Sequence, residues 1–130
     1  MEAPKVDDHI TIKQDGEDRE LFMSFGLLDN LTRHVATPEE VATVPFSPDL
    51  REDILKDILA KRTKSGKVEG ERPEIDDFDI SIADHEKLLN WAMGHILGFY
   101  VRNLQMVSET SNTHEKAIQA VVSSMSGQES

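Results

Sequence analysis

The fourteen residues 88–101, LLNWAMGHILGFYV, contain no Asp, Glu, Lys or Arg, although these types make up 30% of the chain. A membrane span needs about 20 apolar residues, so a stretch this short, which includes Asn90 and His95, suits a buried core helix instead. Its apolar side chains fall on two overlapping helical stripes, which means that the helix is covered on two sides. We therefore expect a core helix that is central to the domain or shared between subunits.

Two glycines in this stretch, Gly94 and Gly98, are four residues apart and share one face of the predicted helix. Glycine inside a helix costs about 1 kcal/mol relative to alanine, so its presence twice on one face needs a reason. Missing side chains allow another helix to approach closely. The two glycines are therefore predicted to mark a close helix crossing.

Local patterns predict the elements that precede this helix. Residues 9–14 alternate Ile10 and Ile12 with polar residues and lead into Asp15-Gly16, a turn signal, which indicates a short strand or hairpin arm. Apolar residues at three- and four-residue steps then predict a helix from about 18 to 35: Leu21, Phe25, Leu28, Leu31 and Val35.

Two further helices are predicted from their start signals. Thr37 and Ser47 are each followed by proline and an acidic residue, the pattern of an N-cap with proline at the first helical position. The first begins a short helical turn over 37–43. The second begins a helix over about 48–63, whose last turn carries cations that favour a helix C-terminus.

Residues 64–80 combine two glycines, a proline and many charges, which indicates a flexible loop that contributes nothing to the core. Charge changes along this region from basic at 61–67 to acidic at 69–79, and the two parts could pair within one molecule or between neighbouring copies. Ser81 or Asp79 can cap the next helix, which we expect to continue to about Val107.

Together these patterns predict a mainly α protein, a small helical domain with a long central C-terminal helix and at most one short N-terminal strand or hairpin. Its expected parts are an N-terminal arm, a helical domain with its charged loop, and a short amphipathic segment with a mobile tail: 1–17, 18–108 with the loop 64–80, and 109–130. Within the last part, the amphipathic segment covers about 114–122, and the end after Ser123 is expected to be mobile.

Composition excludes several kinds of chemistry. The chain has no Cys, so disulfides, thiolate metal sites and Cys nucleophiles are ruled out. Its net charge of −11 opposes direct binding of nucleic acid. The first residues lack the basic and apolar regions of a signal peptide, so export is not expected.

No motif of a catalytic or cofactor site is present. The five histidines lack metal-ligand spacing, and the acidic segment at 76–79 has too few ligands and no central glycine for a calcium loop. No nucleophile elbow, phosphate-binding loop or dinucleotide fingerprint occurs. We therefore expect no catalytic residue, no cofactor and no metal, and a protein that is not an enzyme.

Three segments carry a family resemblance when they are taken in order: ELFMSFGLLDNLTRHV, VPFSPDLREDILKDILAKRTKSGK and FDISIADHEKLLNWAMGHILGFYVRNLQ. Over roughly residues 9–107 the chain resembles the tail assembly chaperones of long-tailed bacteriophages. The resemblance implies a mostly helical protein of the host bacterial cytoplasm that binds the tape measure protein, helps to recruit tail tube subunits, and is absent from the mature virion. It also implies that a second, longer form can arise by ribosomal frameshifting.

Such a protein needs apolar surface for its client on a strongly charged body. Met and aromatic side chains on the first and last helices, together with the paired glycines, are the candidate client or self-association surface: Phe22, Met23, Phe25, Met93, Gly94, Gly98, Phe99 and Met106. The same residue types at helical spacing also fill cores, so a core role stays open for each. Many copies covering one elongated client would make the protein a homo-oligomer, and no membrane contact is expected.

A different class of function also remains open. A small acidic regulatory protein, or a DNA mimic whose carboxylates imitate phosphates, would act by protein–protein binding alone. A DNA mimic needs its acidic residues gathered on one face, whereas the 25 acidic residues of this chain are spread along its whole length. The chaperone is therefore the first hypothesis and the regulatory protein the second.

Overall fold

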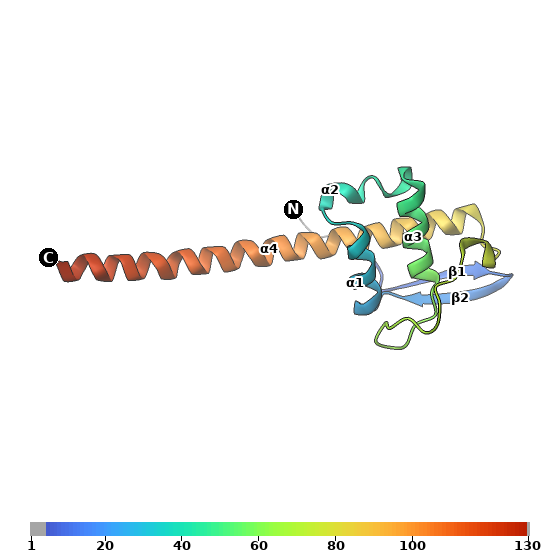
Figure 1. Cartoon of the computed structure of the whole chain (residues 1–130), viewed down its shortest axis with the longest axis horizontal. Coiled ribbons are helices and arrows are strands. Elements are labelled where there is room, and N and C mark those ends of the chain that lie inside the picture. Colours follow the sequence, from blue (N-terminus) through green and yellow to red (C-terminus); the bar gives the residue numbers. More distant parts are fainter. Residues whose placement is uncertain (1–4, 130) are drawn as a thin grey trace.

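The computed structural model describes residues 5–129, apart from the side chains of residues 112 and 123–129. It shows a small body at one end of a single long helix (Figure 1). The elements in order are β1 (His9–Gln14), β2 (Glu17–Phe22), α1 (Phe25–His34), α2 (Pro38–Val41), the 3₁₀ turn η1 (Val44–Phe46), α3 (Pro48–Leu59), the 3₁₀ turn η2 (Ile75–Asp77) and α4 (Ile82–Glu129). The chain is 62% helical, so the prediction of a mainly α protein is confirmed.

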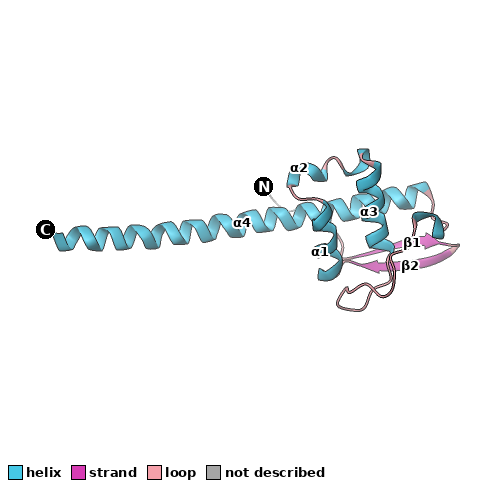
Figure 2. Cartoon of the chain, in the orientation of Figure 1, coloured by secondary structure: helices cyan, strands magenta, loops and turns pink. Residues whose placement is uncertain are grey.

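The two strands form an antiparallel hairpin (Figure 2). Gln14 pairs with Glu17, so the connection has only two residues, Asp15 and Gly16. Both have positive φ, 53° and 84°, as a tight hairpin turn of this hand requires. Ile10 and Ile12 of β1 point into the core. The predicted N-terminal hairpin is therefore confirmed.

The prediction of a helix over 18–35 is wrong in its first part. Residues 17–22 form β2, and α1 begins only at Phe25, after Ser24 accepts a hydrogen bond at its Oγ from the Leu27 amide, 3.2 Å away. Leu21 fits the helical spacing but is buried as a strand residue. β2 begins at Glu17, the position where we expected the N-terminal arm to meet the helical domain.

The predicted starts of α2 and α3 are confirmed. Thr37 and Ser47 accept hydrogen bonds at their hydroxyl oxygens from the amides three residues ahead. However, α3 ends at Leu59 rather than near residue 63, because Ala60 adopts an extended backbone. Arg62 then folds back, and its guanidinium donates to the Asp57 carbonyl oxygen in the last turn, at 2.9 Å. This bond satisfies a carbonyl that the helix end leaves without an internal partner.

The first half of α4 is the central element of the body. Leu88, Ala92 and Ile96 are fully buried, and this part of α4 contacts α1, α2, α3 and β1. Ser81 is the cap, since its Oγ accepts from the Asp84 amide at 3.1 Å. The expected core helix over 88–101 is therefore confirmed, and burial of its apolar stripes explains the absence of charge.

The second half of α4 leaves the body. From Leu104 to Val122 every side chain that the structure describes is exposed, and Figure 1 shows this part of the helix extending away from the other elements. The sequence predicted an end near residue 107 and a separate amphipathic segment, but the helix is continuous to Glu129. The predicted mobile end after Ser123 lies outside the residues whose side chains are described.

The loop over 64–80 contributes to the core, contrary to expectation. Ile80 is buried, and Ile75 and Phe78 pack against the core cluster. Its opposite charges meet within the molecule only loosely, with Lys61 Nζ 4.0 Å from a Glu69 carboxylate oxygen. The regular pattern of a helix or strand is missing here, which is why the sequence did not reveal these buried positions.

Candidate protein-binding groove

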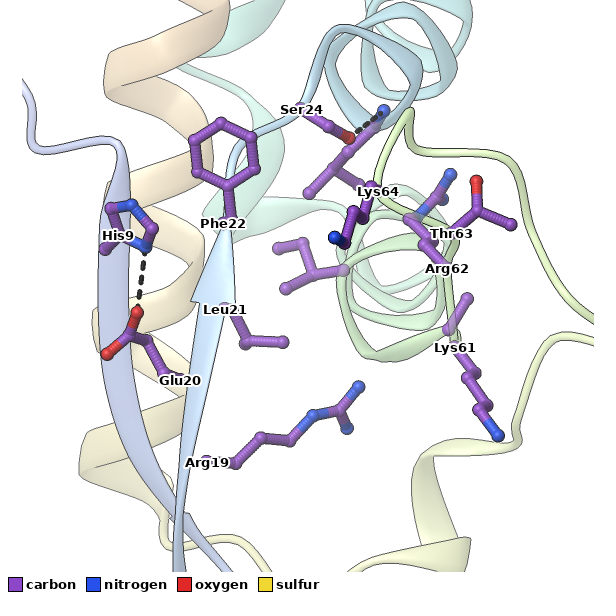
Figure 3. Close-up of a pocket in the computed structure, with 13 residues that line it drawn as sticks. His9, Arg19, Glu20, Leu21, Phe22, Ser24, Lys61, Arg62, Thr63 and Lys64 are labelled. Carbon is purple, nitrogen blue, oxygen red and sulfur yellow. Dashed lines mark hydrogen bonds and ion pairs between the residues drawn. The ribbon is translucent and has the colours of Figure 1, made fainter.

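An open groove lies between β2 and the extended segment at residues 60–64. Its volume is about 650 Å³, and its walls come from both strands, the start of α1, the end of α3 and the segment that follows. Figure 3 shows Leu21 reaching from β2 toward the opposite wall. β2 pairs only with β1 among the described residues, so its second edge is open along this groove.

The floor of the groove is apolar. Leu21, Leu27 and Ile58 line it, and each is buried beneath the surface. Phe22 stands at the end of β2 with 49% of its surface exposed, and its ring lies 4.9 Å from that of His9. Phe25, at the start of α1, follows the lining residue Ser24 in the chain and is 77% exposed, although it does not itself line the groove. Apolar surface therefore continues from the floor to the rim.

The rim of the groove is cationic. Arg19, Lys61 and Lys64 line it together with the largely buried Arg62, against one acidic lining residue, Glu20, although the whole chain carries −11. Arg19 donates to the Leu59 carbonyl oxygen at 3.0 Å, which links β2 to the end of α3, and partial burial lowers the pKa of this guanidinium. The Lys61 side chain is 84% exposed, and Lys64 is exposed as well. The groove therefore joins apolar contact area to positive charge.

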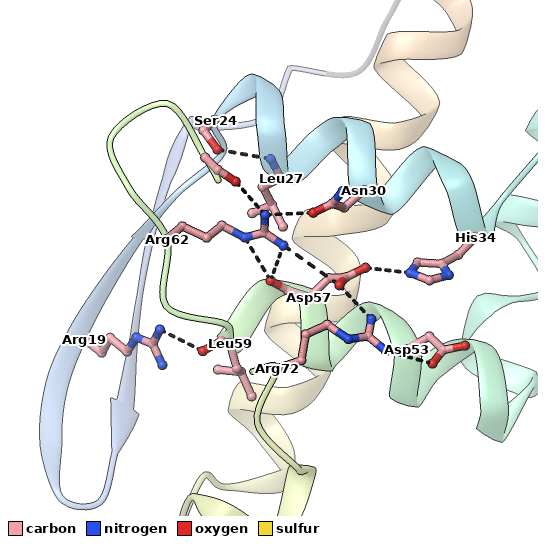
Figure 4. A network of polar contacts seen from close by, with 11 residues as sticks. Arg19, Ser24, Leu27, Asn30, His34, Asp53, Asp57, Leu59, Arg62 and Arg72 are labelled. Carbon is pink, nitrogen blue, oxygen red and sulfur yellow. Dashed lines mark hydrogen bonds and ion pairs between the residues drawn. The ribbon is translucent and has the colours of Figure 1, made fainter. Parts of the chain in front are cut away.

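A buried carboxylate, Asp57, holds the wall behind the groove in place (Figure 4). Its residue is only 3% exposed. Arg72 Nη1 donates to Oδ1 at 2.7 Å, and His34 Nε2 donates to Oδ2 at 2.6 Å when that nitrogen carries the proton. The bond to Asp57 raises the pKa of Arg72. Both carboxylate oxygens are thus engaged, and the cluster ties α1, α3 and the 64–80 loop together.

Arg62 extends this cluster toward the groove. Its guanidinium donates to the Asn30 side chain at 2.9 Å and to the Gly66 carbonyl oxygen at 2.7 Å, besides the Asp57 carbonyl. Burial lowers the pKa of Arg62, and the charge of Asp57 opposes this shift. Gly66 packs directly on Gly26, where an added Cβ would lie 2.6 Å from the Gly66 oxygen. These contacts fix the segment that forms one groove wall.

The structure separates the candidate surface residues into three groups. Phe22, Phe25 and Met106 are exposed, Met23 and Gly98 are buried, and Met93, Gly94 and Phe99 are half-buried. Phe22 lines the groove, Phe25 is the first residue of α1, and Met106 lies on the projecting half of α4. These residues therefore do not form one continuous surface, and the cationic side of the groove was not anticipated from the sequence.

Gly94 does mark a close approach, but not to another helix. A Cβ at Gly94 would lie 2.6 Å from Cγ2 of Val6, in the extended segment before β1. The Asp7 carbonyl oxygen in this segment accepts from Trp91 Nε1 at 2.7 Å and lies 2.8 Å from His95 Nε2. The prediction of a helix crossing at Gly94 is therefore wrong, since an N-terminal strap occupies that face. Trp91 and His95, four residues apart on α4, carry the side-chain nitrogens that contact this segment.

No metal site is found in the part of the chain that the structure describes. No group of three or more His, Asp or Glu side chains is placed to hold a metal ion there. Of the histidines, His9 pairs with Glu20 at 3.0 Å, His34 with Asp57, and His95 with the Asp7 carbonyl. These three rings hold elements together.

Among the described residues, no helix is both long and apolar enough to cross a membrane. Comparison of the chain with protein families, with curated proteins and with solved structures gave no match.

Proposed function

We propose that the protein is a non-catalytic tail assembly chaperone of a long-tailed bacteriophage. In this role it binds the tape measure protein, helps to recruit tail tube subunits in the host cytoplasm, and does not remain in the virion. The proposal takes its identity from the sequence resemblance over residues 9–107. Its physical support is the groove beside β2.

The groove offers the apolar surface and the room for client side chains that such a chaperone needs. A tape measure protein is a long helical rod with exposed apolar seams, and an apolar groove can accept side chains from one face of a helix. Binding pockets of about 300 to 1,000 Å³ enclose a small ligand, so this groove has room for a few client side chains rather than for a whole helix. The exposed Phe22 ring, which lines the groove, adds contact area at its end.

The charge distribution also supports this role. A net charge of −11 keeps a chaperone–client complex dispersed, whereas Arg19, Lys61 and Lys64 offer local attraction at the groove. Exposed charges of this kind steer a partner and are screened by salt. Binding at the groove should therefore weaken as ionic strength rises.

Co-expression with the tape measure protein tests the proposal. The wild-type chain should keep the client soluble and should co-elute with it in size-exclusion chromatography at low salt. The double variant Phe22→Ser, Phe25→Ser should lose both effects because it removes the aromatic surface near the groove. Phe46→Ser is the matched control, since Phe46 is 83% exposed in η1 and does not line the groove.

Thermal melting of each variant alone checks that the substitutions leave the fold intact. A client that is equally insoluble with and without the wild-type chain would end the chaperone proposal. If the client is rescued equally well by the double variant and by the control, it binds elsewhere on the molecule.

A further inference from the structure

We propose that the projecting half of α4 is a self-association element, which pairs with the same segment of a second copy as a short antiparallel coiled coil. Six residues form its seam at alternating steps of three and four: Leu104, Val107, Ser111, His114, Ile118 and Val121. This is the heptad spacing that places side chains along one line facing a partner helix. The seam lies away from the groove.

The seam is open in the single chain. Its four apolar members, Leu104, Val107, Ile118 and Val121, are 58% to 62% exposed, and Ser111 and His114 are exposed as well. A row of apolar side chains along a charged, water-soluble protein is a surface that another chain covers. The regular spacing distinguishes it from scattered surface residues, which need no partner.

The composition of this segment calls for a partner helix. Between residues 104 and 122 there are six β-branched residues, two Ser and one Asn: Val107, Ser108, Thr110, Ser111, Asn112, Thr113, Ile118, Val121 and Val122. Such residues have low helix propensity, so this half of α4 gains little stability of its own beyond the body, although it continues a helix that the body has already formed. Packing along the seam adds stability to this segment when two copies meet.

The order of the seam residues matches a second copy of the same chain. Two apolar positions precede the polar pair Ser111 and His114, and two apolar positions follow it. In an antiparallel pair, Ser111 therefore faces His114 of the partner subunit, Val107 faces Ile118 of the partner subunit, and Leu104 faces Val121 of the partner subunit. Each apolar side chain meets an apolar one, and a hydroxyl meets an imidazole with which it can form a hydrogen bond.

Charge selects the antiparallel arrangement. Residues 103–130 contribute −2, from Glu109, Glu115 and Glu129 against Lys116, so residues 1–102 carry the other −9. A parallel pair would place two bodies of charge −9 side by side. An antiparallel overlap of residues 104–121 places the two bodies at opposite ends of the pair, about 27 Å apart along the helix, which is well beyond the screening length of about 8 Å at physiological salt. Because α4 continues to Glu129, its last two turns then lie alongside the body of the second copy.

The pairing should be weak and reversible. The seam covers fewer than three heptads and has two polar layers at its centre, and the smallest stable protein interfaces bury about 1,200 Å² in total. We therefore expect a dissociation constant of about 1 to 100 µM. A symmetric two-fold contact of this kind closes on itself and yields dimers rather than filaments.

Sedimentation equilibrium of the full chain over a range of concentrations is the first test. The wild type should show a monomer–dimer equilibrium, and Val107→Asp should raise the dissociation constant at least about tenfold by placing a charge in an apolar layer. Met106→Asp is the matched control, because Met106 is 62% exposed but sits about 100° around the helix from Val107. This control should dimerise as the wild type does.

Disulfide trapping tests the relative orientation of the two paired helices. Because the chain has no native Cys, only the introduced cysteines can form a disulfide. An equimolar mixture of Leu104→Cys chains and Val121→Cys chains should give the mixed disulfide on mild oxidation. A dominant disulfide between two Leu104→Cys chains would overturn the antiparallel arrangement in favour of a parallel one.

Two results would overturn self-association altogether. One is a wild-type chain that stays monomeric at every concentration. If such a monomer binds a tape measure peptide through the seam, the partner of the seam is the client and not a second copy. The other is equal dimerisation of Val107→Asp and Met106→Asp. The substituted positions lie outside the body, so both variants should keep it folded. Circular dichroism of both variants checks this.

Discussion

At the scale of single residues, Asp57 is the position where one change should have the largest effect. It is a buried charge whose partners, Arg72 and His34, come from different elements. Asp57→Asn keeps the shape and removes the charge, which should lower the free energy of unfolding by about 3 kcal/mol. Asp53→Asn is the control, since its ion pair with Arg72 spans 3.7 Å at a half-exposed site and is worth about 1 kcal/mol or less. Urea titration measures both, and equal losses would show that burial of Asp57 has no energetic weight.

A second residue-scale prediction concerns the contact between Gly94 and Val6. Gly94→Ala gains helix propensity of about 1 kcal/mol but places Cβ against the Val6 side chain, so it should be destabilising in the wild type. In a Val6→Ala background the close Cγ2 atom is absent, and the same substitution should become stabilising. A double-mutant cycle followed by Trp91 fluorescence measures the change of sign. Additive effects would show that the strap does not press on Gly94.

Tyr100 is the only tyrosine, so the titration of its phenol can be followed alone and should show that the ring is buried. Burial raises the pKa of its phenol above the usual value, and the hydroxyl donates to the Val35 carbonyl oxygen. Because the raised pKa belongs to the folded state, this group's contribution to stability is complete below the unfolded pKa of about 10 and is lost as pH rises above it. Ultraviolet titration of phenolate should give a higher midpoint in the native protein than in urea. Equal midpoints would contradict the burial of this ring.

At the scale of elements, the two halves of α4 should differ in what they do for stability. The core ends near Val101, and the described side chains from Leu104 to Val122 are exposed. A chain that stops after Val107 should therefore unfold with a free energy within about 0.5 kcal/mol of the full chain when both are dilute. Its helical circular dichroism should fall because the projecting turns are gone. A large loss of stability would mean that the distal half folds back on the body.

At the scale of the whole molecule, the projecting helix dominates the shape. A compact protein of this length has a radius of gyration of about 14 Å, whereas a helix as long as α4 alone extends for about 72 Å. Small-angle scattering of the dilute chain should give a clearly larger radius of gyration than the compact value. The chain that stops after Val107 should return close to it. A compact full-length particle would contradict the straight, continuous α4.

The sequence by itself determined the features that depend on neighbours a few residues apart. Asp15-Gly16 predicted the hairpin turn, Thr37 and Ser47 predicted two helix starts, and the uncharged run over 88–101 predicted the buried core helix. The cap bonds act over three residues, and burial of one helix face leaves a short-period pattern. These signals are complete within a short segment, so tertiary structure did not alter them.

Tertiary structure decided what depends on residues far apart in the chain. Leu21 fits a helix and a strand equally, and pairing with β1 selected the strand. The bond from Trp91 to the Asp7 carbonyl joins positions 84 residues apart, and the Arg19 contact with Leu59 that closes the groove spans 40. Side chains such as Asp57 and Arg62 look like ordinary surface charges in the sequence, because their burial depends on which elements pack around them.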